Sequence, residues 1–329
     1  MPVRILAPTP AAIAEAARIL RGGGLVAFPT ETVYGLGANA LDADAVQKIF
    51  DAKGRPASNP LIVHVASEAA ARALARSWPE AAARLAAAHW PGPLTLVVEK
   101  TDAIPDRVTA GGPTVALRVP AHPIALELLR AAGRPLAAPS ANRSEEISPT
   151  TARHVADSLG PFVDDLIVLD GGACEVGIES TVVDVTNAEP VVLRPGVLTL
   201  ARSPRSPQSP GRADDDASAR RDPSPDLPPD SPSASPARSP GQNARHYAPR
   251  KPLLLIRPND LPAALRAGDA HLVLPSAPEA AARRLYAELR RLDADTSVSR
   301  ILVVEPPPGP EWDGIRDRLT RATARGETR

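Results

Sequence analysis

The chain has 329 residues, 43% of them hydrophobic, which is enough for a sizeable core and, by length, for about two domains. Lys and Arg number 38, as do Asp and Glu, so no net charge draws the chain to nucleic acid or to a membrane surface, and any basic site must be local. Cys174 is the only cysteine, which excludes an internal disulfide framework and a cysteine-based zinc site; we expect it to be a buried small hydrophobe. The sequence shows no signal-peptide pattern and no apolar run of membrane-spanning length, so we expect a cytoplasmic protein.

Short apolar runs alternate with Ala-rich stretches along the first 200 residues. Apolar runs of this length, bounded by Gly, Pro, Asn or Asp, predict buried strands. The predicted strands are "GLVAFPT", "NPLIVHV", "PLTLVVE", "TVALRVP", "RPLAAPS", "DLIVLDGG", "STVVDV" and "PVVLRPG".

Three helices are indicated by residues that suit their ends. Asp42 is placed to cap "ADAVQKIFDAKG", Ser77 precedes "WPEAAARLAAAHW", and Ser148 leads into "TTARHVADSLG". Gly54 and Gly160 suit the ends of the first and the last of these. So many strands with so irregular a helix rhythm predict an α/β fold built on a mixed, twisted sheet with flanking helices rather than a simple doubly wound sheet.

One compositional break divides the chain. Residues 201–239 contain repeated Ser-Pro steps and almost no large apolar side chain, so they cannot bury enough surface to offset the entropy of ordering. We predict an N-terminal domain at 1–200, a linker at 201–250 and a C-terminal domain at 251–329. A phosphorylated tail or an RNA-binding arm is the alternative for this segment, although its Asp residues neutralise its Arg residues.

The C-terminal segment predicts a small Rossmann-like α/β domain. Its strands are expected at "KPLLLIRP", "AHLVLPS" and "SRILVVEPP". Helices are expected at 261–267, at 278–292 and from Gly314 onward. This order is that of a βαβ unit with right-handed crossovers.

Polar residues crowd the joint between the first predicted helix and the next strand, in "FDAKGRPASNPLIVHV" at 50–65. Lys53 and Arg55 stand two residues apart and can converge on one anion, for which a phosphate group is the best match. No Walker loop occurs in the sequence, so a nucleotide would be held by scattered side chains. The alternative is a solvated basic turn.

Similar polar runs follow other predicted strands. "FPTETVYGLGANA" at 28–40 combines hydroxyls and glycines, and "APSANRSEEISPTTA" at 138–152 is rich in Ser and Asn. "GIESTVVDV" and "VVLRPG" add two more runs, centred on Ser180 and Arg194. Strand ends in α/β proteins commonly bind small polar ligands, whereas the plain alternative is a set of turns with satisfied hydroxyls.

Taken in this order, these motifs resemble the Sua5/YrdC/YciO family of threonylcarbamoyl-AMP synthases. The resemblance covers about residues 10–200 through "PTETVYGLG", "KGRPASNPLIVH", "WPGPLTLV", "VALRVP", "PSANRS", "ISPT", "ESTVVD" and "LRPG". "SPGQNARHYAP" and "RILVVEPPPGPEWDGIRDRLTRATA" are similar to the linker and to the close of the Rossmann-like domain in the two-domain Sua5 form. The resemblance implies the YrdC-like mixed sheet together with the second domain.

The resemblance implies a nucleotidyltransferase that forms threonylcarbamoyl-AMP and pyrophosphate from L-threonine, bicarbonate or CO2, and ATP. In the family the product passes to the tRNA threonylcarbamoyl transferase complex, which modifies adenosine 37 of tRNAs that read ANN codons. Whether this chain touches tRNA directly is left open. Mg2+ is expected through the ATP phosphates, with no metal ligands from the protein.

The resemblance also implies roles for individual residues. Lys53 and Arg55 are the expected catalytic residues at the ATP phosphates. The remaining expected ATP residues are Asn59, Thr114, Ser140, Asn142, Ser148, Arg194 and Tyr247. The expected threonine residues are Thr32, His64, Arg118, Ser180 and Thr181, with Arg118 pairing with the substrate carboxylate.

Some of these roles have alternatives. Without the family resemblance, His64 is better interpreted as a strand-end histidine satisfied by its neighbours, and the resemblance implies a positional rather than a basic role for it. Tyr247 is either part of a lid over the nucleotide or an anchor for the second domain. Glu145 stands where the family pattern has glycine, which would strain a left-handed backbone, and Gln242 stands where the linker signature has methionine.

The sequence leaves two rival functions to consider. Relatives of this fold have been discussed as double-stranded RNA binders, and such a protein would bind RNA with strong salt dependence and without ATP or threonine. The balanced charge argues against this reading. The second rival is a carbamoyl-adenylate enzyme of the hydrogenase-maturation type, which carries zinc-finger and acylphosphatase-like parts that have no counterpart motif in this sequence.

Overall fold

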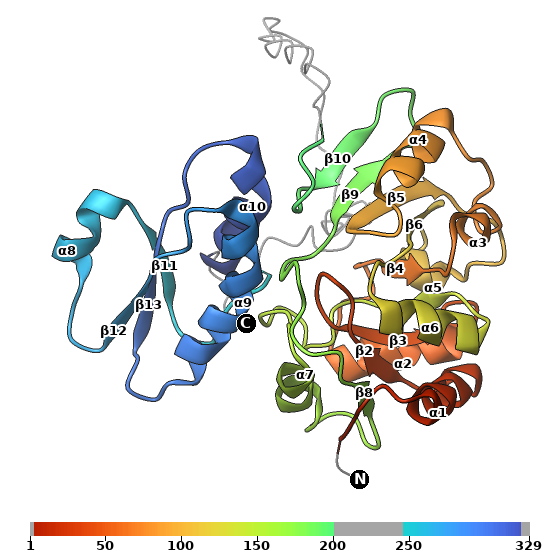
Figure 1. Ribbon diagram of the computed structural model, residues 1–329, viewed down its shortest axis with the longest axis horizontal. Coiled ribbons are helices and arrows are strands. Elements are labelled where there is room, and N and C mark those ends of the chain that lie inside the picture. Colours follow the sequence, from red (N-terminus) through yellow and green to blue (C-terminus); the bar gives the residue numbers. More distant parts are fainter. Residues whose placement is uncertain (1–2, 201–245, 324–329) are drawn as a thin grey trace, which may run out of the picture.

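The computed structural model describes residues 3–200 and 246–323 (Figure 1). Within these residues, the N-terminal domain is built on a ten-stranded sheet in the order β1-β8-β2-β3-β7-β4-β6-β5-β9-β10. Its strands are β1 (Arg4–Leu6), β2 (Val26–Phe28), β3 (Gly35–Asn39), β4 (Ile62–His64), β5 (Leu94–Glu99), β6 (Thr114–Arg118), β7 (Leu136–Ala137), β8 (Ile167–Leu169), β9 (Thr181–Asp184) and β10 (Val191–Arg194).

The strand pairing confirms the predicted mixed sheet. β1 and β2 pair with β8, β4 with β6 and β5 with β9 in parallel, whereas β3 runs antiparallel to β2 and β7. The flanking helices are α1 (Pro10–Arg21), α2 (Ala43–Lys53), α3 (Glu68–Arg72), α4 (Glu80–His89), α5 (Asp106–Thr109), α6 (Pro123–Ala132) and α7 (Ala152–Leu159). They bury apolar faces against the sheet, and Cys174 is buried among this core as expected.

The ends of α2 are fixed by the residues that the sequence indicates. The Asp42 carboxylate accepts hydrogen bonds from the amides of Asp44 at 3.0 Å and Ala45 at 3.1 Å, which satisfies donors that the first helical turn leaves open. Gly54 ends the helix with φ 59°, a left-handed conformation that glycine adopts without strain. Lys53 is therefore the last helical residue, and Arg55 directly follows the turn.

Two predicted helix caps were wrong. α4 begins after Pro79, not at Ser77, because proline disfavours helical backbone in the residue before it. α7 is capped by Thr151, whose hydroxyl accepts from the His154 amide, and the Ser148 hydroxyl is turned to another partner described below. Gly160 does follow the end of α7.

β3 lies in the run of hydroxyls and glycines at 28–40, which was not among the predicted strands. It pairs with β2 in register, with Val26 opposite Gly37. A Cβ atom at Gly37 would lie 2.7 Å from the Phe28 ring, so the small residue is required by close packing inside the sheet.

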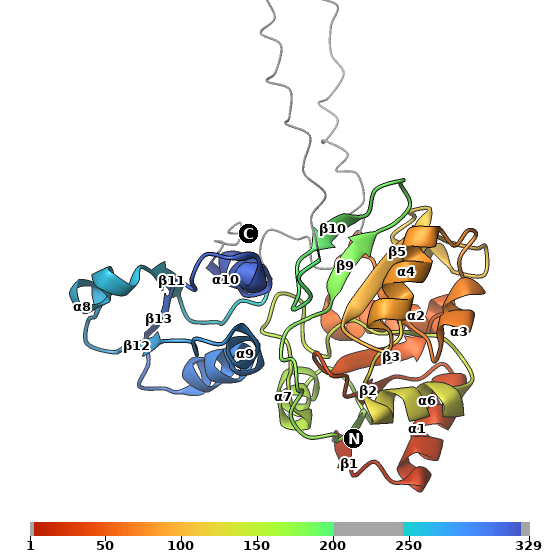
Figure 2. The same cartoon turned by 45° about the horizontal axis from the view of Figure 1, so that its top comes forward.

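The C-terminal domain is a three-stranded parallel sheet in the order β11-β13-β12, as the Rossmann-like prediction required. Its strands are β11 (Leu253–Ile256), β12 (Asp269–Leu272) and β13 (Arg300–Val304). Its helices are η1 (Pro258–Asp260), α8 (Leu261–Ala264), α9 (Pro278–Ala294), η2 (Pro310–Trp312) and α10 (Asp313–Thr323). Two views show α9 and α10 lying between this sheet and the N-terminal domain (Figures 1 and 2).

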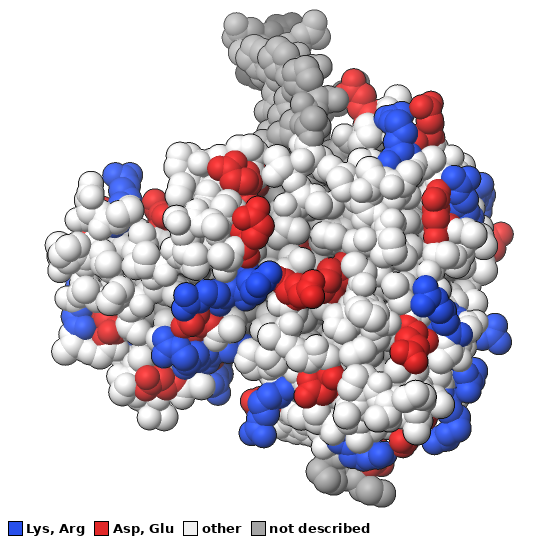
Figure 3. Space-filling view, viewed as in Figure 1, with Lys and Arg blue, Asp and Glu red and all other residues white. Residues whose placement is uncertain are grey.

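The surface carries no field of one sign on the face that Figure 3 shows, where Lys and Arg side chains are interspersed with Asp and Glu over both domains. In the described part of the chain, no helix is both long and apolar enough to cross a membrane. The predicted linker lies outside the described residues except for 246–250, and so does Gln242.

Candidate active site

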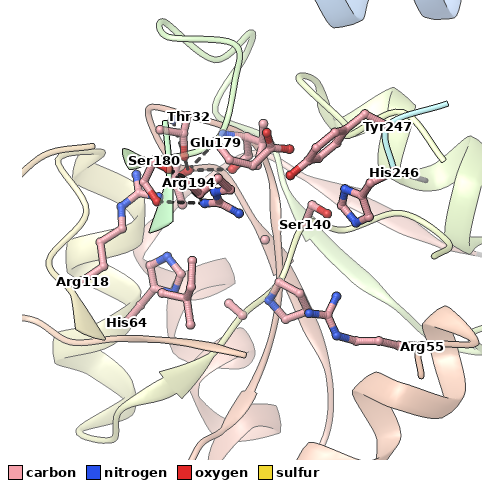
Figure 4. A pocket seen from close by; sticks show the side chains of 16 residues that line it. Thr32, Arg55, His64, Arg118, Ser140, Glu179, Ser180, Arg194, His246 and Tyr247 are labelled. Carbon is pink, nitrogen blue, oxygen red and sulfur yellow. Dashed lines mark hydrogen bonds between the residues drawn. The ribbon is translucent and has the colours of Figure 1, made fainter. Parts of the chain in front are cut away.

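A pocket lies where several strand ends of the N-terminal domain meet residues 246–247 (Figure 4). The polar side chains that line it come from segments far apart in the sequence. Thr32 precedes β3, Arg55 follows α2, His64 and Arg118 end β4 and β6, Ser140 follows β7, Glu179 and Ser180 precede β9, and Arg194 ends β10.

Arg55 is held in place by neutral oxygen atoms. Its Nε donates to the Asn59 carbonyl at 3.0 Å, and its Nη2 donates to Asn59 Oδ1 and to the Pro60 carbonyl, each at 2.7 Å. The side chain is 8% exposed, and burial lowers its pKa to about 9, which leaves it protonated at neutral pH. Asn59 therefore orients Arg55 without cancelling its charge.

Lys53 lies behind the pocket rather than in its wall. Its Nζ donates to the backbone carbonyls of Ser140, at 2.6 Å, and of Asn142. Burial, with the nearby Arg55 guanidinium, lowers the pKa of Lys53 well below its ordinary value. In this arrangement Lys53 fixes the loop that carries Ser140, and its predicted contact with phosphate stays a prediction.

Arg118 faces a carboxylate that sequence reasoning did not single out. Its Nη2 lies 2.7 Å from Glu31 Oε1, an ion pair whose angles fall outside hydrogen-bond geometry. His64 lies in the same wall. Burial, and next the charge of Arg118, lower the pKa of His64 to about 3, so its imidazole is neutral near pH 7.

Ser180 joins three strands. Its Oγ lies 2.8 Å from Thr95 Oγ1 of β5, and Arg194 Nη2 donates to its carbonyl at 3.0 Å and to its Oγ at 3.2 Å. Burial lowers the pKa of Arg194. Thr181 does not line the pocket, and its hydroxyl contacts Leu198 instead.

Glu179 is a pocket residue that the sequence analysis missed. Its Oε1 accepts from the Ser148 hydroxyl at 2.5 Å, and its Oε2 accepts from Tyr286 at 2.9 Å and from Arg318 Nε at 2.8 Å. Burial would raise its pKa, but the charges of Arg318 and Arg194 and these hydrogen bonds outweigh burial and lower the pKa to about 2. The available signal was its place directly before Ser180 in "GIESTVVDV".

Residues 246–248 close one side of the pocket. The Ala248 amide donates to the Glu145 carbonyl at 2.8 Å, and the His246 amide donates to the Arg321 carbonyl at 3.3 Å. The Tyr247 ring is fully buried and stacks on Tyr286 with centroids 5.7 Å apart. The space open to the centres of water molecules is only about 40 Å³, so the pocket is nearly closed.

Buried polar atoms without a hydrogen bond gather at this pocket. Buried polar groups are normally bonded, so these atoms are available to hydrogen-bond a polar ligand or ordered water. Within the described residues the atoms concerned at or directly behind the pocket include Asn59 Nδ2, His64 Nδ1, Asn142 Oδ1, His246 Nδ1 and the Tyr247 hydroxyl.

The structure brings most of the predicted residues together. Those in the pocket wall are Thr32, Arg55, His64, Arg118, Ser140, Ser180, Arg194 and Tyr247. Those that instead bond to a wall residue are Lys53, Asn59 and Ser148. Asn142 lies behind the wall, where its carbonyl accepts from Lys53 and its side chain donates to the carbonyls of Arg143 and Glu146. Thr114 begins β6, four residues or about 13 Å along the strand from Arg118, and does not line the pocket.

Glu145 has φ 70°, so this position does require the left-handed backbone that the family's glycine would favour. No group of three or more His, Cys, Asp or Glu side chains in 3–200 and 246–323 is arranged to hold a metal ion.

These features define an α/β protein with a pocket at the ends of its sheet strands, lined by Arg55, Arg118 and Arg194, which suits an anionic ligand. Two family models match the chain: one described as "Telomere recombination" over residues 18–196, and one described as "Threonylcarbamoyl-AMP synthase, C-terminal domain" over residues 206–324. The chain belongs to the Sua5/YciO/YrdC family, in its two-domain form.

Individual relatives agree with this assignment. The chain is 53% identical over 185 residues to threonylcarbamoyl-AMP synthase of Pyrococcus abyssi and 51% identical over 188 residues to that of Bacillus subtilis. These matches cover 56% and 57% of this chain and 54% of each relative, so the aligned part spans about half the length of the curated relatives. A crystal structure of P. abyssi Sua5 complexed with L-threonine matches with a TM-score of 0.80 at 35% identity, over 98% of this chain and 96% of that chain.

Proposed function

We propose that this chain is a threonylcarbamoyl-AMP synthase, a nucleotidyltransferase that forms threonylcarbamoyl-AMP and pyrophosphate from L-threonine, bicarbonate or CO2, and ATP. The observation that carries the proposal is the convergence of Arg55, Arg118 and Arg194 on one nearly closed pocket. The named relatives and the threonine complex of P. abyssi Sua5 support it.

The chemistry explains why cations gather there. The threonine amine adds to CO2 and loses a proton, which gives a carbamate. A carbamate oxygen then attacks the α-phosphorus of ATP, a new O–P bond forms, the bond to the β-phosphate oxygen breaks, and pyrophosphate leaves. Both reactants are anionic, so positioned cations lower the barrier by offsetting repulsion and holding the reacting atoms together.

The wall residues divide into two groups by position. Arg55, Ser140 and Arg194 are the candidates for the ATP phosphates, with Asn59 and Lys53 holding Arg55 and the Ser140 loop. The other candidate supports for the nucleotide are Asn142, Ser148, Thr114 and Tyr247.

The threonine side is assigned to the wall around Arg118 and His64, and Ser180, which is bonded to Arg194, lies where the two sides meet. Arg118 is the candidate partner of the substrate carboxylate, where a guanidinium can make two parallel hydrogen bonds. The neutral His64 can donate or accept a hydrogen bond there but cannot act as a base, since its pKa is about 3. Thr32, Ser180 and Thr181 are the remaining candidates on this side.

The pocket leaves only about 40 Å³ for the centres of water molecules, which is room for about three waters and too little for ATP. Residues 246–248 therefore move away to admit substrates and return to exclude water, which gives Tyr247 the role of a lid. Because Tyr247 stacks on Tyr286, it also has the role of an anchor for the C-terminal domain when the pocket is closed.

Mg2+ is proposed to enter with ATP and to neutralise charge on its phosphates. Glu179 in the pocket wall and Glu31 beside Arg118 are already ion-paired with Arg318 and Arg118, so the phosphates would supply most of its ligands. We further propose a cytoplasmic protein that hands its product to the tRNA threonylcarbamoyl transferase complex, for modification of adenosine 37 in tRNAs that read ANN codons.

The test is pyrophosphate release by the purified full-length chain from Mg2+-ATP in bicarbonate buffer, with and without L-threonine, followed by mass spectrometry of the product. Threonine-dependent release together with threonylcarbamoyl-AMP is the expected result. A folded protein that releases no pyrophosphate but binds double-stranded RNA with strong salt dependence would instead support the nucleic-acid binder.

A further inference from the structure

Helix α10 of the C-terminal domain sends one arginine into the N-terminal domain. Arg318 is 1% exposed, and its Nε donates to Glu179 Oε2 at 2.8 Å. Its Nη1 donates to the Pro195 carbonyl at 2.6 Å, and its Nη2 donates to the Glu179 carbonyl at 3.3 Å. One guanidinium thus binds three oxygens of the other domain.

These acceptors stand directly beside two residues of the pocket wall. Glu179 precedes Ser180, and Pro195 follows Arg194. Ser180 and Arg194 are bonded to one another, so Arg318 holds both ends of this pair from outside the pocket. Arg318 does not itself line the pocket.

Helix α9 also contacts this wall, through Tyr286 and Arg290. The Tyr286 hydroxyl donates to Glu179 Oε2 at 2.9 Å, and Arg290 Nε donates to the Ser148 carbonyl at 3.4 Å. Since the Ser148 hydroxyl donates to the other oxygen of Glu179, that carboxylate joins both helices to the loop of Ser148.

A close glycine contact lets α10 approach. A Cβ atom at Gly314, one turn before Arg318, would lie 2.4 Å from the Gly196 carbonyl oxygen, below the distance that atoms tolerate. The helix therefore rests directly on the backbone that follows Arg194, and the reach of Arg318 is fixed by this contact.

We propose that Arg318, assisted by Tyr286, is a positioning residue of the active site, supplied by the C-terminal domain to hold Glu179, Ser180 and Arg194 in their working geometry. The inference rests on the proposed function for the reaction that it serves. It assigns the C-terminal domain a part in catalysis, because the wall of the pocket is secured by side chains from α9 and α10. The lowered pKa of Glu179 agrees, since Arg318 is the largest of the groups that lower it.

Three full-length variants test this proposal. Arg318→Lys keeps a positive charge beside Glu179 but loses the fork that reaches the two carbonyl oxygens. Tyr286→Phe removes a single hydroxyl. Arg300→Met is the matched control, because Arg300 pairs with Asp269 inside the same domain and far from the pocket.

The expected result is a fall in kcat of at least about tenfold for Arg318→Lys, because small displacements of positioned groups strongly reduce turnover. Tyr286→Phe should lower kcat by about threefold, less than Arg318→Lys, because Glu179 keeps its bonds to Arg318 and Ser148. Arg300→Met should stay within about twofold of the wild type. Thermal unfolding must show that each variant is folded at the assay temperature.

Two results overturn the proposal: kcat of Arg318→Lys and Tyr286→Phe equal to that of Arg300→Met, or a loss of kcat seen only in variants that have unfolded. Arg318→Met combined with Glu179→Gln removes both charges, and Glu179→Gln alone is its reference because Glu179 lines the pocket; the double variant should be folded and slower than the single one.

Failure of the proposed function is recognised separately, by a wild-type protein without threonine-dependent turnover. In that case hydrogen exchange, which needs no turnover, decides the inference. Amides around Ser180 and Arg194 should exchange faster in Arg318→Lys than in Arg300→Met, and equal rates overturn the proposed hold on the wall.

Discussion

Two hollows of this molecule are rich in arginine, and they differ in what the arginines contact. One is the pocket described above. The other is a groove between α7 and α9, whose lining includes Arg153, Arg250, Arg290 and Arg291. The volume open to the centres of water molecules is about 530 Å³ in the groove and about 40 Å³ in the pocket.

In the groove, two exposed arginines meet carboxylates, while Arg290 donates to the carbonyls of Ile147 and Ser148. Arg153 lies 2.9 Å from Asp157, and Arg250 lies 3.0 Å from Asp293, with both arginine side chains more than three-quarters exposed. In the pocket, Arg55 is buried, and its hydrogen bonds within the described residues go to amide and carbonyl oxygens. The comparison teaches that neither cavity size nor the number of arginines marks an anion site. The proposed anion site differs from the groove in burial, because Arg55, Arg118 and Arg194 are all buried, whereas Arg153 and Arg250 are exposed and ion-paired.

The largest effect is expected when the buried arginine of the pocket, Arg55, is removed. Arg55→Ala should reduce kcat/KM for ATP by at least about 100-fold, the scale of losing one charge-stabilising donor. Arg250→Ala in the groove should leave kcat/KM within about twofold, because exposed ion pairs contribute little. Steady-state pyrophosphate release measures both, and near-wild-type turnover by folded Arg55→Ala would refute the phosphate assignment.

The second prediction concerns stability against pH. Burial is the main cause that lowers the pKa of both His64 and His246 to about 3. In the unfolded chain these histidines have the ordinary pKa of about 6.5. Between about pH 6.5 and pH 3 the unfolded chain therefore binds protons that the folded chain does not. The free energy of unfolding should therefore fall with decreasing pH, by about 1.4 kcal/mol per pH unit for each histidine.

Urea unfolding between pH 6 and 4 measures this slope. His64→Asn should remove one histidine's share, while His271→Asn, at an exposed position of β12, should keep the wild-type slope. Equal slopes in both variants would show that His64 is not buried in neutral form.

The third prediction separates the two sides of the pocket. Arg118→Lys retains the charge but not the planar fork, so KM for L-threonine should rise about tenfold while KM for ATP stays within about twofold. Initial rates with each substrate varied at saturation of the other provide the measurement. A rise confined to the KM for ATP would move Arg118 to the nucleotide side.

The smallest effect lies on the loop between the two hollows, which runs from Ser140 in the pocket to Glu146 in the groove. Glu145→Gly should raise the free energy of unfolding by up to about 1 kcal/mol, because glycine adopts φ 70° without strain. Glu145→Ala removes the charge but keeps the Cβ atom, so it should give no such gain in urea unfolding. Equal gains in both variants would assign the effect to charge.

The sequence by itself determined where most helices and strands form and which residues make up most of the candidate site. Asp42 and Gly54 delimit α2 because their signals act on backbone groups within three residues. The apolar runs became strands in both domains, since burial of such runs is favourable in any compact arrangement. The polar runs after these strands did meet, because strand ends share an edge of the sheet.

Only the tertiary structure decided which of those side chains face the pocket and which stand behind it. Lys53 turned to the carbonyls of Ser140 and Asn142, and Ser148 turned to Glu179 rather than to the start of α7. Glu179 and its partner Arg318 are 139 positions apart. The residues around Glu179 do not predict that Arg318 is its partner, nor the reverse. A buried charge pairs with an opposite charge that packing brings close to it, and this packing depends on both domains.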